Sequence, residues 1–222
     1  MPEVVGVEEA LARASRLSLA ASAVDERFVL GLVGPPGVGK STFARALMES
    51  LGGQVCAALF AMDGFHLAHE VLSARGDVDR KGAPETFDAE GYVNLLRRLR
   101  ARDEEVVWAP VYERSLHNGV AGAVELPASV SFLVTEGNYL LLDSGAWVKV
   151  RGLLDEVWFV QGDESVRVQR LAQRHQLHGR SAEAALERAT RGVDAQNAVL
   201  VTATRDRADL VVDVRGWECT VC

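Results

Sequence analysis

The chain is poor in cysteine, in positive charge and in long apolar runs, and each deficit argues against a class of protein. Only 3 of its 222 residues are cysteine, too few for a disulfide framework, so a reducing, cytoplasmic location is predicted. The net charge of −7 and the pI near 5.3 argue against nucleic acid or an anionic membrane as the main partner. No apolar run approaches the ~20 residues that span a bilayer, and the acidic start "MPEVVGVEEALARAS" lacks the layout of a signal peptide.

The remaining composition is that of an ordinary globular protein, with 48% hydrophobic and 25% charged residues. A length of 222 residues suits one domain with a sizeable core. Cys219 and Cys222 form a terminal "CTVC". Because no second ligand pair or nearby histidine accompanies these two cysteines, we assign them no metal or redox role.

Strand-like apolar runs alternate with helical patterns along the chain, which is typical of a parallel α/β sheet. Strands are predicted over residues 28–34, 54–66, 129–137, 154–162 and 208–214, with a further strand and hairpin arm over 106–112 and 123–130. Helices are predicted over residues 7–24, 42–51, 84–102, 163–178 and 181–200. The pattern therefore indicates one α/β domain over residues 1–222.

The stretch "GPPGVGKST" lies between a predicted strand and a predicted helix and fits the phosphate-loop pattern G-x-x-x-x-G-K-[ST]. Its glycines let backbone amides curl around phosphate oxygens, and the helix that follows directs its positive end toward them. The residues expected to bind nucleotide are Gly34, Pro35, Pro36, Gly37, Val38, Gly39, Lys40, Ser41 and Thr42. Lys40 would reach the outer phosphates, and the hydroxyl of Ser41 would ligate Mg²⁺. The sequence thus predicts a nucleoside triphosphate, ATP, bound with Mg²⁺.

Two acidic residues follow predicted strands, where ligands of open parallel sheets gather. Asp63 lies in "MDGFH" (62–66) and could accept the proton of an incoming hydroxyl group. Glu136 lies in "TEGNYLL" (135–141) and could hold Mg²⁺ directly or through water. The structural alternatives are a helix-capping or turn aspartate for Asp63 and an exposed strand-end carboxylate for Glu136.

The predicted helix "DESVRVQRLAQRHQLHGR" places several basic side chains on one face. Arg167, Arg170 and Arg174 fall at positions i, i+3 and i+7, a spacing at which like charges repel. A triphosphate would compensate this repulsion, and a mobile arginine lid would shield the transferring phosphate from water. The alternative is a solvated face balanced by Asp163 and Glu164.

In this order, "MDGFH", "RKGAPETFD" (80–88), "PVYER" (110–114), "TEGNYLL" and the arginine-bearing helix resemble the phosphoribulokinase/uridine kinase family, which includes bacterial pantothenate kinases. The resemblance runs from residue 28 to about residue 214. It is greatest to a short bacterial subgroup labelled as sugar-kinase-like or fructose-transport kinases. It implies a kinase-type P-loop NTPase fold: a three-layer α/β sandwich with a mostly parallel five-stranded sheet and an arginine-bearing helical lid, at residues 163–182 here.

The resemblance also implies roles for individual residues. Asp63, Lys40, Arg170 and Arg174 would be catalytic, and Ser41 and Glu136 would place the metal. The expected substrate contacts come from Asp63, Phe65, His66, Arg80, Lys81, Trp108, Tyr112, Arg114, Glu136 and Asn138. For His66, the alternative is a histidine that satisfies a hydrogen bond in the core. Family members often form dimers, so a homodimer is one expected arrangement.

These motifs predict an ATP-dependent kinase that phosphorylates an alcohol group of a small metabolite. The acceptor stays open among a sugar such as fructose, a pantothenate-like acid and a nucleoside. The alternative is a phosphate-loop switch that hydrolyses nucleotide without a small-molecule acceptor. A switch would not need a strand-end aspartate beside an enclosed pocket.

Overall fold

A computed structural model of the chain describes residues 1–218. Cys219 and Cys222, the two cysteines of the terminal "CTVC", lie outside this range. No helix of residues 1–218 is both long and apolar enough to cross a membrane. Cys56 has a free, exposed thiol.

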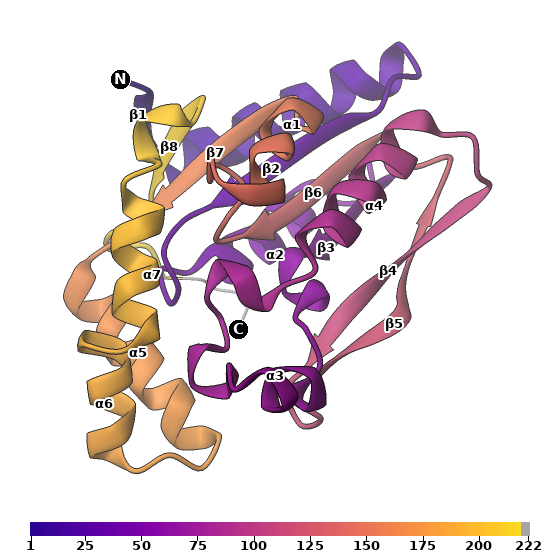
Figure 1. Cartoon of the computed structure of the whole chain (residues 1–222). Coiled ribbons are helices and arrows are strands. Elements are labelled where there is room, and N and C mark those ends of the chain that lie inside the picture. Colours follow the sequence, from indigo (N-terminus) through magenta and orange to yellow (C-terminus); the bar gives the residue numbers. More distant parts are fainter. Residues whose placement is uncertain (219–222) are drawn as a thin grey trace.

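Six parallel strands form the central sheet (Figure 1). Their order across the sheet is β1-β8-β7-β2-β6-β3, and each neighbouring pair runs parallel. The strands are β1 (Glu3–Gly6), β2 (Phe28–Val33), β3 (Ala57–Ala61), β6 (Phe132–Gly137), β7 (Glu156–Gln161) and β8 (Leu210–Asp213). The central strands β2 and β6 are almost wholly buried, as expected of strands covered on both faces.

The predicted α/β architecture is confirmed, but the sheet has six strands rather than five. The extra strand is β1, which pairs with β8 at the edge of the sheet, with Val4 opposite Val211. It is only four residues long, and Val5 is its single buried residue. So short a segment carries too little periodicity to be told apart from the helix that follows it.

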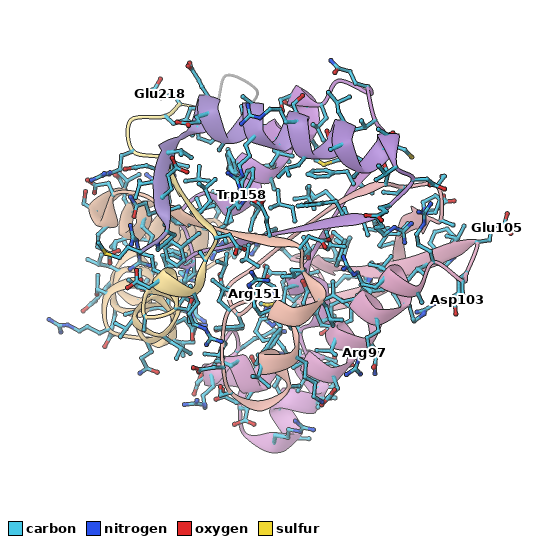
Figure 2. All side chains as sticks on the ribbon, turned by 90° about the horizontal axis from the view of Figure 1, so that it is seen from above. Arg97, Asp103, Glu105, Arg151, Trp158 and Glu218 are labelled. Carbon is cyan, nitrogen blue, oxygen red and sulfur yellow. The ribbon has the colours of Figure 1, made fainter. Side chains whose placement is uncertain are left out.

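Helices cover both faces of the sheet. On one face, α1 (Val7–Ala23) and α2 (Lys40–Ser50) share a buried apolar cluster with Trp158 of β7. On the other face, α4 (Ala89–Ala101) packs with apolar residues 139–154. Figure 2 shows Trp158 among the interior side chains, whereas Asp103, just after α4, projects from the outer end of the molecule. Because helices pack on both faces of one sheet, the fold is the predicted three-layer sandwich.

A separate antiparallel ribbon, β4 (Val106–Glu113) and β5 (Asn118–Pro127), lies at one side of the sheet (Figure 1). Its register shifts between Ala109 and Val111. Such a bulge turns the following side chains to the opposite face of a strand. The short helical turns are η1 (Met62–Phe65), α3 (His69–Arg75), η2 (Val78–Arg80), η3 (Pro84–Thr86), η4 (Gly145–Lys149), η5 (Arg151–Leu153) and η6 (Arg205–Arg207).

Three helices stand on the other side of the molecule from this ribbon: α5 (Glu164–Leu177), α6 (Ala182–Thr190) and α7 (Val193–Thr202) (Figure 1). Asp163 caps α5 by accepting hydrogen bonds from the backbone amides of Ser165 and Val166. The single helix predicted over residues 181–200 is instead two, because the chain turns at Gly192. A Cβ atom at Gly192 would lie 2.8 Å from the Cα of Arg188, so this turn needs a glycine.

Candidate active site

The polar residues of the site lie where three adjacent strands end. In the order β2-β6-β3, Glu136 of β6 is flanked in register by Leu32 of β2 and Ala61 of β3. The phosphate loop follows β2, and Asp63 follows β3 in η1. Parallel pairing therefore brings together the groups that the sequence separates by up to a hundred positions.

The phosphate loop has the backbone shape of an anion cradle. Gly37 and Gly39 have φ values of +82° and +110°, in the left-handed region that glycine adopts without strain. A Cβ atom at Gly37 would lie 2.9 Å from the backbone oxygen of Arg167. Helix α2 begins after Gly39 without a side-chain cap, which leaves its first backbone amides for a bound anion.

Lys40 is buried at the base of this loop. Its Nζ donates to the backbone oxygen of Gly34 at 2.8 Å and to Oδ1 of Asn138 at 2.7 Å. Burial lowers the pKa of Lys40, while the carboxylates of Glu136 and Asp63 oppose that shift. These acceptors hold the ammonium group at the phosphate-loop cavity, where it could also donate to a bound anion.

Ser41 and Glu136 are in direct contact, since the hydroxyl of Ser41 donates to Oε1 of Glu136 at 2.6 Å. Glu136 is 9% exposed, which excludes the exposed-carboxylate alternative. Burial raises the pKa of Glu136, and the Lys40 ammonium opposes the rise. Residues 1–218 contain no cluster of three or more His, Cys, Asp or Glu suited to a metal ion. One hydroxyl and one carboxylate nevertheless fit Mg²⁺, which takes few protein ligands and keeps waters and phosphate oxygens.

Two cavities meet at this end of the sheet. The phosphate-loop cavity, about 420 Å³, is lined by Pro36, Gly37 and residues 39–42 together with Glu136 and Arg170. The second cavity, about 390 Å³, lies among η1, residues 78–87, the ribbon and the α5–α7 helices; we call it the acceptor cavity. The residues that line both are Pro36, Asp63, Arg114, Asn138 and Arg174. A side chain at this junction can touch a phosphate and a second molecule at once.

Asp63 owes its place at the junction to the close packing of η1 against β4. A Cβ atom at Gly64 would collide with the backbone oxygen of Pro110, so only glycine lets the two backbones approach. The amide of His66 donates to the backbone oxygen of Asp63 and closes the turn. No helix begins at Asp63 with that side chain as its cap, which removes the capping alternative. Asp63 does lie in a turn, η1, but it also lines both cavities.

The lid arginines divide into two kinds. Arg167 is 3% exposed, pairs with Glu164 at 2.5 Å and donates to the backbone oxygen of Pro36 at 3.2 Å. It therefore braces the phosphate loop. Of the alternative, a solvated face balanced by Asp163 and Glu164, only the pairing with Glu164 holds, because Arg167 is buried. Arg170 and Arg174 line the phosphate-loop cavity and have no carboxylate within 4 Å among residues 1–218. Burial, and then the nearby Arg114, lower the pKa of Arg174.

All five histidines of the chain line the acceptor cavity: His66, His69, His117, His175 and His178. The ring of His66 stacks on Phe87, with ring centroids 3.9 Å apart, and lies 4.7 Å from Tyr112. Burial lowers the pKa of His66 to about 4, so its ring is neutral near pH 7. Its Nδ1 is buried without a hydrogen-bond partner in the described residues, which disfavours a purely structural role.

A polar network from α5, α6 and α7, not predicted from the sequence, holds the wall of the acceptor cavity. His175 Nε2 lies 2.6 Å from Oδ2 of Asp194, and Arg188 donates to the backbone oxygen of Lys81 at 2.7 Å. Asn197 donates to the backbone oxygen of Gly82 at 2.8 Å. The available signal was that Asp194 and Asn197 share a helix face with an apolar residue, a pattern that indicates buried polar side chains.

Three of the expected substrate contacts lie away from both cavities. Phe65 packs edge-to-face on Tyr92 in the core, with centroids 5.3 Å apart. Arg80 is exposed and pairs with Glu85. Trp108 is 51% exposed and lies before the register shift between β4 and β5. Tyr112 lies after that shift, and its ring is 4.7 Å from the ring of His66. The structure brings His66, Lys81, Tyr112, Arg114 and Asn138 to the acceptor cavity.

Comparison with known proteins places this site in a family. Residues 29–220 match the Phosphoribulokinase / Uridine kinase family. A Schizosaccharomyces pombe protein named "Putative uridine kinase C227.14" is 31% identical over 197 residues, which are 84% of this chain and 83% of that protein. A pantothenate kinase of Enterococcus faecalis is 34% identical over 143 residues, 63% of this chain and 46% of that enzyme. The chain thus matches about half the length of the pantothenate kinase.

Solved structures agree with this assignment. A crystal structure from Silicibacter sp. TM1040, described as that of a "putative fructose transport system kinase", is 34% identical with a TM-score of 0.77 and is covered over 98% of its chain and 89% of this one. YFH7 of Saccharomyces cerevisiae has a TM-score of 0.79 at 16% identity, covering 96% of this chain and all of that one, and shows a shared fold alone. The chain belongs to the phosphoribulokinase/uridine kinase family and is a P-loop small-molecule kinase.

Proposed function

We propose that this kinase transfers the γ-phosphate of ATP, bound with Mg²⁺, to an alcohol group of a small metabolite. The observation that carries the proposal is that Asp63 lines both cavities, so one carboxylate borders the nucleotide phosphates and a second molecule. The names of its relatives make a nucleoside, a pantothenate-like acid and a sugar such as fructose the first acceptors to consider.

The side chains around the phosphate loop suit a triphosphate and its metal. Lys40, Arg170 and Arg174 supply positive charge, and the uncapped start of α2 supplies backbone amides. Ser41 and Glu136 would hold Mg²⁺, which neutralises charge that develops on the phosphate oxygens.

Asp63 would accept the proton of the acceptor hydroxyl as the acceptor oxygen bonds to the γ-phosphorus. The bond from that phosphorus to the β–γ bridging oxygen breaks with its electron pair, ADP leaves, and the proton passes from Asp63 to solvent. Lys40, Arg170 and Arg174 would stabilise the negative charge during transfer. Residues 163–182 would act as a lid that excludes water, which limits hydrolysis.

The experiment that tests this proposal measures ADP release from ATP and Mg²⁺ with a panel of acceptors: fructose, pantothenate, uridine, cytidine, pyridoxal, glycerate and glycerol 3-phosphate. An acceptor that raises ADP release and appears as its phosphate ester, one ester per ADP, supports the kinase. ADP release at a rate independent of any acceptor would instead support a hydrolysing switch.

The matched variants are Asp63→Asn and Asp103→Asn. Asp103 lies at an outer position (Figure 2) and lines neither cavity. We expect Asp63→Asn to lower kcat by roughly 10²–10⁴-fold, the range for loss of a general base, with little change in ATP affinity. Asp103→Asn should behave as wild type. Near-wild-type turnover by Asp63→Asn would refute the base assignment.

A further inference from the structure

The acceptor cavity is positively charged although the protein as a whole carries a net charge of −7. Its basic lining residues are Lys81, Arg114, Arg174, Arg180 and Arg188. Its acidic lining residues are Asp63 and Asp194. The cavity therefore has three more basic than acidic side chains, and a local field of this sign attracts anions.

Internal ion pairs leave much of this charge uncompensated. Asp194 is already engaged by His175 at 2.6 Å and lies 3.9 Å from Arg188. Lys81 donates to the backbone oxygen of His117 at 2.5 Å. Neither Lys81 nor Arg114 has a carboxylate within 4 Å among residues 1–218, and the carboxylate that acts electrostatically on Lys81 is Glu70, which does not line the acceptor cavity.

The nucleotide does not account for Lys81. Arg114 and Arg174 border both cavities, and Arg170 and Lys40 border the phosphate loop. Lys81 lines only the acceptor cavity, where its Nζ lies 5.3 Å from the centroid of the Tyr112 ring. Burial lowers the pKa of Lys81, and Glu70 opposes that shift. An anionic ligand beside the ammonium group would likewise favour its charged form.

Lys81, Arg114 and the candidate base Asp63 all act electrostatically on the ring of His66. Asp63 favours the charged form of the His66 ring, whereas Lys81 and Arg114 disfavour it. Tyr112 is likewise influenced by both Arg114 and Asp63. Both cations line the acceptor cavity together with His66 and with Asp63, whose carboxylate would receive the hydroxyl proton. A small molecule spanning this neighbourhood would meet a base at one end and cations at the other.

We propose that the acceptor is an anionic alcohol, a hydroxy acid or the phosphate ester of a polyol, whose anionic group binds between Lys81 and Arg114 while its hydroxyl group faces Asp63. This inference rests on the proposed kinase function for the role of Asp63, but the charge selection can be tested by binding alone. Carboxylate and phosphate share the chemistry that the two cations recognise.

The test uses three ligands with one three-carbon skeleton: glycerol 3-phosphate, glycerate and glycerol. The full chain is saturated with Mg²⁺ and a non-hydrolysable ATP analogue, so that the phosphate loop is filled, and each ligand is titrated by isothermal calorimetry. We expect at least one of the two anions to bind about tenfold or more tightly than glycerol. The anion that binds better distinguishes a phosphate ester from a carboxylic acid. Glycerol binding as tightly as both anions, or no binding by either anion, overturns the proposal.

Substitutions of the two cavity cations test where the anion binds. Lys81→Met and Arg114→Met should each weaken binding of the preferred anion by about tenfold and reduce its preference over glycerol. The matched control is Arg191→Met, which removes one positive charge at an exposed position outside both cavities. Anion affinity that is unchanged in both cavity variants, or lowered equally by Arg191→Met, overturns the subsite. Because no turnover is required, a protein that binds the anion but only hydrolyses ATP would refute the kinase proposal and leave the charge selection standing.

Discussion

The two cavities of the site are built in different ways. The phosphate-loop cavity is built around Pro36, Gly37 and residues 39–42, to which the neighbouring strand ends, the ribbon and α5 add side chains. The acceptor cavity is assembled from η1, the 78–87 segment, the ribbon and three helices near the end of the chain. Phosphate binding is thus encoded locally, by glycines, a lysine and a helix start, whereas acceptor binding depends on how distant segments pack.

The largest effect is expected from a substitution in the phosphate-loop cavity. Lys40→Met removes the ammonium group that lies 2.8 Å from the oxygen of Gly34, and we expect kcat/KM for ATP to fall by roughly 10²–10³-fold. The matched control Lys149→Met removes an exposed ammonium group paired with Glu90 and should leave kcat/KM as in wild type. A Lys40→Met enzyme close to wild type in steady-state kinetics would contradict the role of Lys40.

A smaller effect, confined to the acceptor side, is expected for Asp194→Asn. The change weakens the contacts of Asp194 with His175 and Arg188, and Arg188 holds the backbone of Lys81. We expect the free energy of unfolding to fall by about 1–3 kcal/mol and the KM for the acceptor to rise, while the Kd of an ATP analogue stays unchanged.

The control for this change is Asp206→Asn, since Asp206 is an exposed partner of Arg205. A surface pair of this kind contributes about 0–1 kcal/mol, so little change in stability is expected. Equal weakening of nucleotide and acceptor binding by Asp194→Asn would show that the two cavities are not independent.

The smallest effect concerns pH. Burial lowers the pKa of His66 from 6.5 to about 4, so the folded state keeps this ring neutral while the unfolded state binds a proton below pH 6.5. The free energy of unfolding should therefore fall as the pH drops from about 6.5 to 4, by roughly 1 kcal/mol at pH 5.5. His66→Gln should remove this contribution in urea unfolding measured across that range. Parallel pH profiles for the variant and the wild type would argue against it.

The same local-versus-distant distinction explains what could be predicted. The strand, loop and helix around Lys40 were expected and are confirmed as β2 and α2. Trp108 and Tyr112 were both expected at the acceptor, but the register shift at Pro110 leaves only Tyr112 beside His66. A proline inside a strand marks an edge or a bulge, but it does not say which side chains then face the site. Asp194 was overlooked because its partners, His175 and Arg188, lie on other helices.

By itself, the sequence determined the alternation of strands and helices, the phosphate loop and the two strand-end carboxylates, because these depend on residue type and short-range spacing. Tertiary structure alone decided that β1 joins the sheet, that Arg167 braces the loop instead of facing a ligand, and that five histidines meet in one cavity. These features depend on packing between distant segments, where the close approach of two backbones or one bulge determines which face a side chain presents.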